Sequence, residues 1–250
     1  MLAFNLRLYR LALRGIGIGN FESPALSGEH HFISNFCAQY GGAVVLDVGA
    51  NVGDYSAQIC RLDQTSKVFA FEPHPASYES LESQARVSGF TAINMALGNA
   101  RGTQQLFDYL EGNGSQHATL YRDVIEEMYG APSTSVEVAV ETVDSFMALR
   151  GIDRINLLKI DTEGNELQVL QGSFNAIKNK QIDIVHFEFN SMNVMSKAFM
   201  RDFYDLLPGF SFYRMFPDGL AFLAQYNCHL LEIFEYQNIV AIRNGCSFKP

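Results

Sequence analysis

Short apolar runs alternate with amphipathic segments along most of the chain after residue 43. Several runs are continuous stretches of Val, Ile, Leu and Phe, which is the pattern of strands buried on both faces of a parallel sheet. The segments between them carry apolar residues three and four positions apart, as helices with one buried face do. We therefore predict an α/β fold. The predicted strands are 44–49, 67–72, 91–96, 104–110, 136–142, 155–161, 183–189, 210–216 and 238–244.

Helices are expected between these strands, and the last two strands are expected to form an antiparallel hairpin that closes the sheet. The segment between strands 104–110 and 136–142 is long and rich in Gly, Ser and Tyr. Loops of this length are usually functional, so we predict that residues 108–135 form a substrate lid. The expected helices are 54–62, 75–87, a short one from Thr142 or Asp144 to Gly151, 163–171 and 196–207.

The first fifteen residues, MLAFNLRLYRLALRG, mix three arginines with leucines. Their apolar run is interrupted too often for a membrane span or a secretory signal, and no later segment is long enough to span a bilayer. We expect a helix within an extension of residues 1–40 that packs on a single domain formed by residues 41–250. A helix attracted to a membrane surface is the alternative.

The composition is that of a globular protein with a sizeable core, since 48 % of the 250 residues are apolar. The formal net charge of −9 disfavours binding to nucleic acid, which normally requires a basic face. Cys37, Cys60, Cys228 and Cys246 are scattered and form no C-x-x-C pair. This spacing favours reduced thiols in a cytoplasmic protein and gives no sign of a zinc site.

A glycine-bearing loop, LDVGANVGDYS (46–56), joins the first predicted strand to the first predicted helix. Gly49 and Gly53 allow a tight turn and close approach to a ligand, and the helix N-terminus supplies free N–H groups. The spacing is neither G-x-G-x-x-G nor that of a phosphate-binding P-loop. Glu72 ends the second strand, where a doubly wound sheet places the ribose of a nucleoside, and its carboxylate can accept both ribose hydroxyls.

Acidic residues follow the strand at 155–161, where Asp161, Glu163 and Glu166 lie within the stretch KIDTEGNE. Asp161 ends the strand on the same sheet edge as the glycine loop, and Glu188 ends the next strand on that edge. Thr162 can cap the following helix, and Glu163 can either stabilise its first turn or face the cleft. We expect Glu166 to lie on the helix surface.

Five stretches in order, LDVGANVGDYS, FEPHP, NMALGN, ETVDSF and LLKIDTEGNELQVLQG, resemble the FkbM-type S-adenosylmethionine-dependent methyltransferases. The resemblance covers roughly residues 44–190. It implies a class I methyltransferase (Rossmann-like) fold, a three-layer sandwich with a mostly parallel seven-stranded sheet. It also implies S-adenosylmethionine as cofactor. On the matching positions, Asp47, Gly49, Ala50, Asn51 and Gly53 would form the donor loop, Glu72 would bind the ribose, and Ala96 and Leu97 would lie near the adenine.

The resemblance further implies O-methylation of a hydroxyl on a sugar, a polysaccharide precursor or a secondary metabolite. An attacking hydroxyl must lose its proton, and a carboxylate within hydrogen-bond reach can accept it. We therefore expect Asp161 or Glu163 to accept the proton or orient the hydroxyl, with Glu188 in support. No dedicated metal motif accompanies these carboxylates, so we predict no metal site. The alternatives are an NAD-type oxidoreductase and a non-catalytic binding module.

The acceptor is expected to meet two aromatic regions, residues 108–135 and 203–236. Aromatic rings of this kind can stack on a sugar or an apolar ring. The proposed residues are Tyr109, Tyr121, Tyr129, Phe212, Tyr213 and Phe216.

Overall fold

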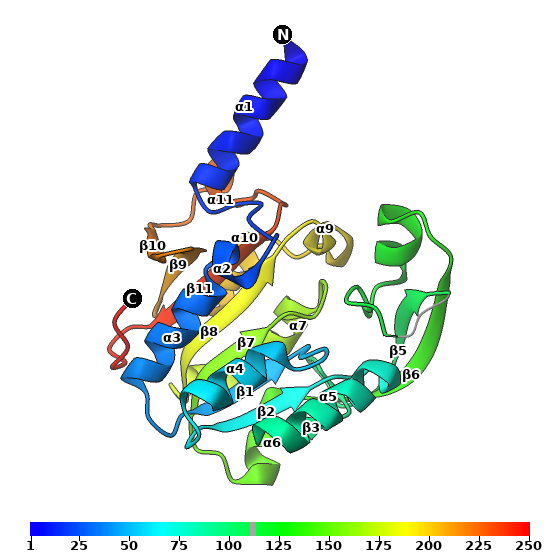
Figure 1. Cartoon of the computed structure of the whole chain (residues 1–250), viewed down its shortest axis with the longest axis vertical. Helices are drawn as coiled ribbons and strands as arrows, with labels where there is room; N and C mark the ends of the chain where they lie inside the picture. The colour runs from blue at the N-terminus through cyan, green and yellow to red at the C-terminus, as the bar shows by residue number, and fades with distance from the viewer. Residues whose placement is uncertain (111–113) are drawn as a thin grey trace.

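A twisted eight-stranded sheet forms the centre of the computed structural model, which describes residues 1–110 and 114–250 (Figure 1). Its strand order is β10-β9-β11-β8-β7-β1-β2-β3. Strands β3, β2, β1, β7 and β8 run parallel, and β11 pairs antiparallel with both β8 and β9. The bounds are β1 Val44–Val48, β2 Lys67–Phe71, β3 Thr91–Ile93, β7 Ile155–Ile160, β8 Ile182–Phe189, β9 Phe210–Phe216, β10 Gly219–Leu223 and β11 Gln237–Arg243.

Helices cover both faces of this sheet, because alternate residues of each buried strand point to opposite sides. One face packs on α3 (Glu29–Gln39), α4 (Asp54–Leu62) and α5 (Pro75–Ser88). The other face packs on α6 (Val143–Arg150), α7 (Glu166–Gln171), α8 (Phe174–Lys178) and α10 (Met200–Leu206). The predicted three-layer α/β sandwich is therefore confirmed, with antiparallel final strands. The eighth strand, β10, was not predicted.

A second sheet of three strands, in the order β4-β6-β5, lies to one side of the main sheet (Figure 1). It contains β4 (Ala96–Leu97), β5 (Gly102–Tyr109) and β6 (Ser133–Glu141), and the π-helix η1 (Val124–Met128) lies between the last two. The predicted strand 91–96 is thus divided between the two sheets. The predicted lid, residues 108–135, follows β5 and contains η1, and its residues 111–113 lie outside the described part of the chain.

The N-terminal extension divides into a packed part and a projecting part. Phe32, Ile33 and Phe36 of α3 are buried in the core, and α2 (Pro24–Ser27) precedes that helix. In contrast, α1 (Leu2–Gly15) stands away from the body, and Leu13 is its one buried residue (Figure 1). The prediction that residues 1–40 pack on the core is therefore wrong for α1. Within the described residues, no helix has the length and apolar character to cross a bilayer.

Two short helices complete the fold beside the C-terminal strands: α9 (Met192–Ser196) and α11 (Cys228–Leu231).

Candidate active site

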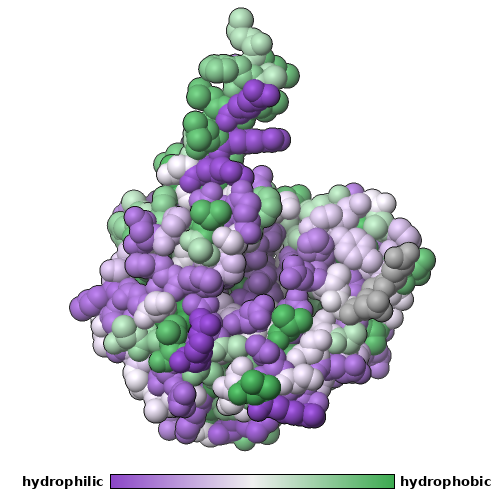
Figure 2. Space-filling view, in the orientation of Figure 1, coloured by the Kyte–Doolittle hydropathy of each residue, from purple (hydrophilic) through white to green (hydrophobic). Residues whose placement is uncertain are grey.

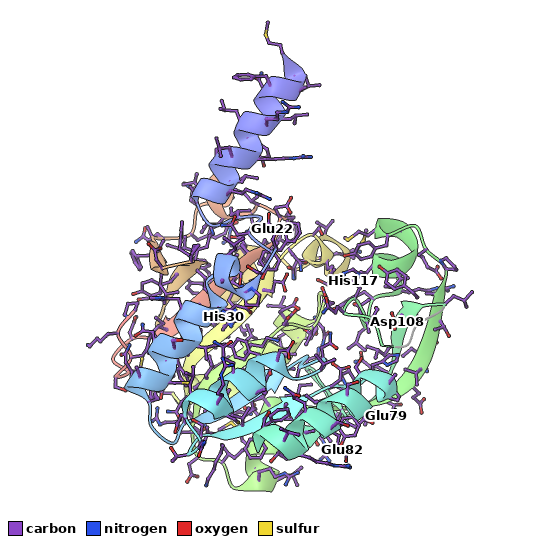
Figure 3. The ribbon with its side chains drawn as sticks, viewed as in Figure 1. Glu22, His30, Glu79, Glu82, Asp108 and His117 are labelled. Atoms are coloured by element: carbon purple, nitrogen blue, oxygen red, sulfur yellow. The ribbon has the colours of Figure 1, made fainter. Side chains whose placement is uncertain are left out.

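A cavity of about 1400 Å³ opens at the carboxyl ends of the parallel strands, where Figure 2 shows a hydrophilic hollow. The loop after β1 and the end of β2 form one wall, and the acidic residues after β7 and at the end of β8 form another. Residues from α3 and from the segment between β5 and β6 close the sides, and Figure 3 shows His30 and His117 on these two parts. The cavity therefore lies where ligands bind in open α/β sheets.

Gly49 brings the first loop into direct contact with the backbone after β7. Its φ of 76° is in the left-handed region, and a Cβ there would lie 1.7 Å from the carbonyl oxygen of Asp161. Only glycine satisfies both constraints. Gly49, Ala50 and Asn51 line the cavity, whereas Gly53 lies behind the loop, where a Cβ would lie 2.8 Å from side-chain atoms of both Leu81 and Phe90.

Glu72 fixes the outer part of this loop. Its two carboxylate oxygens accept the backbone N–H groups of Asn51, at 3.0 Å, and His74, at 2.8 Å. Burial raises the pKa of Glu72 to about 7, and these two N–H groups oppose that rise. Each carboxylate oxygen retains a free acceptor site, so the residue can still bind hydroxyl groups from the cavity that it lines.

Lys159 holds two carboxylates beneath the cavity. Its Nζ lies 3.2 Å from Asp47 and 3.3 Å from Asp161, and it donates to the carbonyl oxygen of Gly49 at 3.3 Å. Burial would lower the pKa of Lys159, but the two carboxylates outweigh it and raise that pKa, so the ammonium stays charged. Asp47 is fully buried, accepts from the Ser56 hydroxyl at 2.7 Å and does not line the cavity. Its contacts are those of an anchor for the loop and for Lys159.

Asp161, Glu163 and Glu188 all line the cavity, so the structure brings together the three predicted catalytic carboxylates. Burial raises the pKa of Asp161, but Lys159 outweighs it and lowers that pKa below the usual range. Burial and the charge of Asp161 raise the pKa of Glu188 well above its usual value. These opposite shifts favour an ionised Asp161 beside a protonated Glu188.

Glu163 faces the cavity and does not belong to the following helix. Its φ is 55°, an uncommon conformation for a residue other than glycine, and its carbonyl oxygen accepts from the Thr119 hydroxyl at 2.7 Å. Its Oε2 is buried without a hydrogen-bond partner among the described residues. Burial and the charges of Asp161 and Glu166 raise its pKa well above the usual range.

Glu166 binds the backbone just before α7, where the sequence led us to expect capping by Thr162. It is 2 % exposed, so the expectation of a surface residue is wrong. One of its oxygens accepts the N–H groups of Thr162 and Gly164 and the Thr162 hydroxyl, and the other accepts from Asn193. Because Glu166 binds these groups from inside the helix, α7 begins at residue 166 and Thr162 is not its N-cap.

Two buried histidines, His74 and His186, have structural partners. His74 is the N-cap of α5, where its Nδ1 accepts the N–H of Ala76 at 3.2 Å. His186 lies between the Tyr55 hydroxyl, at 3.1 Å, and Asn238 Oδ1, at 3.0 Å. Burial lowers the pKa of His186 to about 4, so the imidazole is neutral at physiological pH.

Other residues line the cavity that the sequence did not single out. Glu29, the first residue of α3, lies near Lys159 and Asp161, and burial raises its pKa to about 7. His117 stacks on Tyr129 with 4.8 Å between ring centroids, and its Nδ1 lies 2.9 Å from the Tyr109 hydroxyl. Residue spacing gave no signal for this set, because its members come from segments far apart in the chain.

The predicted acceptor wall is partly wrong. Tyr129 lines the cavity, but Phe212 is stacked on Tyr204 in the core at 3.8 Å, and Tyr213 packs on the core and lies 5.5 Å from Phe222 of β10 between ring centroids. Phe212 and Tyr213 belong to β9, whose two faces are both covered. From the region 203–236, only Glu235 and Tyr236 reach the described cavity.

Comparison with known proteins agrees with this arrangement. Residues 47–216 match the family model described as the methyltransferase FkbM domain, which covers more than half of the chain. The chain belongs to the FkbM methyltransferase family. The matched range contains the glycine loop, Glu72, Ala96 and Leu97, and all three carboxylates, but neither Glu29 nor Tyr236.

Three curated relatives illustrate the range of the family. Methyltransferase sdnD of Sordaria araneosa is 32 % identical, over 51 % of this chain and 59 % of its own length. The hexuronic acid methyltransferase AglP of Haloferax volcanii is 26 % identical, over 57 % and 54 %. The 2-O-methyltransferase NoeI of Sinorhizobium fredii is 22 % identical, over 71 % and 76 %. The chain thus spans little more than half the length of sdnD and AglP.

Proposed function

We propose that this chain transfers a methyl group from S-adenosylmethionine to a hydroxyl of a sugar, a polysaccharide precursor or a secondary metabolite. The observation that carries the proposal is one cavity with the Glu72-bound glycine loop on one wall and three carboxylates on the other. The names of AglP and NoeI, a hexuronic acid methyltransferase and a 2-O-methyltransferase, support a hydroxylated carbohydrate as acceptor.

The residues on the loop side fit the donor. The close approach of Gly49 to Asp161 leaves no room for a Cβ, so the loop backbone lies against the backbone that follows β7. The N–H groups of Gly49 and Ala50 donate to the carbonyl oxygen of Phe71, which holds this backbone in place at the edge of the cavity. Gly49, Ala50 and Asn51 would hold the amino-acid end, Glu72 the ribose hydroxyls, and Ala96 and Leu97 the adenine, while Asp47 and Gly53 support the loop from behind. When bound, S-adenosylmethionine supplies a methyl group on a sulfonium, which departs as a neutral thioether.

The three carboxyl groups on the acceptor side have different proposed roles. Asp161 is ionised next to Lys159, so it can accept a hydrogen bond from the hydroxyl and orient it. Glu163 has a buried, unpartnered oxygen that faces the cavity, and its raised pKa makes its ionised form a stronger base than Asp161, although that form is the smaller fraction. We assign to this ionised fraction the proton that leaves as the oxygen attacks. Glu188 retains its proton toward Asp161 and supports that residue.

Two measurements test this function. Calorimetry should show binding of S-adenosylhomocysteine and none of NADH, and the reverse result would favour an oxidoreductase. A panel of sugars and polyols, incubated with donor carrying a deuterated methyl group, should give a labelled methyl ether by mass spectrometry. Binding of S-adenosylhomocysteine without labelling of any hydroxyl, amine or thiol acceptor would instead support a non-catalytic module.

A further inference from the structure

The helix α1 exposes an unusual amount of apolar surface. Phe4 is 66 % exposed and Leu11 is 67 % exposed, and they are two of six large apolar residues on this helix that face solvent. Figure 2 shows hydrophobic side chains beside hydrophilic ones on this helix, which projects from the body. Exposed apolar patches of this size on a folded protein mark interaction sites.

The charged residues of α1 are confined to one side of it. At 3.6 residues per turn, Arg7, Arg10 and Arg14 fall within about 60° of one another. Leucines, Phe4 and Tyr9 occupy an arc of about 220° on the remaining surface, interrupted by Asn5. Arg14 contacts Glu22, while Arg7 and Arg10 are exposed and form no ion pair with any residue that the structure describes.

We propose that α1 binds the surface of an anionic lipid bilayer. The helix would lie in the interface, with its apolar arc in the acyl boundary and Arg7 and Arg10 extended toward lipid phosphates. The charge is complementary, because residues 2–15 contain three arginines and no Asp or Glu in a chain of net charge −9. A second copy of the chain would bury a single stripe of the helix, whereas a bilayer can cover the whole arc.

Membrane binding by α1 would also affect where the cavity lies. Residues 16–28 connect the helix to α3, and Phe21, Pro24 and Glu29 line the cavity. A membrane-bound α1 would therefore hold one wall of the cavity near the lipid surface. The proposal does not depend on methyl transfer, since the helix contributes no residue to the described cavity.

The chain contains no tryptophan, so a single introduced one reports on its own surroundings. Phe4→Trp should show a blue shift of emission with vesicles of phosphatidylcholine and phosphatidylglycerol, and brominated lipids should quench it. Leu149→Trp is the matched control, because Leu149 is 69 % exposed on α6, far from α1 in sequence. Its emission should not change. If the emission of Phe4→Trp changed no more than that of Leu149→Trp, the proposal would be overturned.

Co-sedimentation with the same vesicles separates the two contributions. Phe4→Asp with Leu8→Asp should weaken partitioning at least about tenfold, and Arg7→Gln with Arg10→Gln about fivefold for each arginine removed. All four substituted residues are exposed, so the thermal unfolding of the body should be unchanged. Equal binding to phosphatidylcholine alone, or an α1-dependent dimer that ignores vesicles, would contradict the proposal.

Discussion

The two walls of the cavity are built differently. On the donor side, Glu72 accepts two backbone N–H groups, and Asp47 is paired with Lys159 in the core. On the acceptor side, Glu163 keeps a buried oxygen without a partner among the described residues. The groups of the first wall are held by partners within the protein, whereas the second wall keeps one unpartnered oxygen, on Glu163, that a substrate can satisfy.

Removing the charge that supports the donor wall should have the largest effect on stability. Lys159→Met leaves Asp47 buried and unpaired, so the free energy of unfolding should fall by about 3–5 kcal/mol. Lys178→Met, on the exposed surface of α8, should change it by less than about 0.5 kcal/mol. Urea denaturation measures both. An equal loss of stability in the two variants would show that the ion pair between Lys159 and Asp47 does not stabilise the donor wall.

The contact between the two walls can be tested at Gly49. Gly49→Ala combines a left-handed φ with a clash against the Asp161 carbonyl, so it should cost at least about 3 kcal/mol and abolish donor binding. Gly89→Ala is the matched control, since Gly89 also has a positive φ but nothing within 4 Å of an added Cβ. It should cost about 1 kcal/mol. Similar costs at both positions would mean that the loop and Asp161 can separate.

Two carboxyl groups that line the cavity, the partly buried Glu29 and the buried Glu72, predict an unusual pH dependence of stability. Glu29 and Glu72 have a pKa of about 7 in the folded protein against an ordinary 4.5, so the folded state binds more protons than the unfolded state between these values. The free energy of unfolding should therefore fall as pH rises from about 4.5 to about 7. Glu29→Gln should remove part of this slope and stabilise the protein by about 1–3 kcal/mol at pH 8.

The matched control for this slope is Glu79→Gln, because Glu79 is exposed on α5 (Figure 3). It should leave the dependence on pH unchanged. Urea denaturation from pH 5 to pH 8 compares the variants, and a wild-type stability that rises over this range would contradict the assigned burial of the carboxyl groups.

Some features of the fold and of the donor wall could be predicted from the sequence. The helix 54–62 was predicted to the residue, because Gly53 starts it in a left-handed conformation and the chain becomes extended at Asp63. The role of Glu72 as a cavity residue likewise follows from a strand end beside a glycine loop. These two features are set by residues close together in the chain, and such patterns are visible in a sequence. The contacts of Gly49 with Asp161 and of Asp47 with Lys159 join residues more than 100 positions apart, and the sequence did not display them.

The acceptor side depends on contacts that a sequence does not display. Glu163 turns to the cavity because Glu166 binds the N–H groups of Thr162 and Gly164 from within α7, which delays the start of the helix. Glu29 and Tyr236 reach the cavity from opposite ends of the chain. The periodicity of α1 showed an apolar face but not whether anything covers it, so its exposure required the structure.

The central claim is that donor binding and proton removal belong to different walls. The most direct measurement is to compare Glu163→Gln with Glu72→Gln for both the Kd of S-adenosylhomocysteine and the single-turnover rate of methyl transfer to an acceptor from the panel. We predict that Glu163→Gln keeps the wild-type Kd while its rate falls about 10²–10⁴-fold, and that Glu72→Gln weakens donor binding. Wild-type turnover in Glu163→Gln, or loss of donor binding in that variant, would contradict the claim.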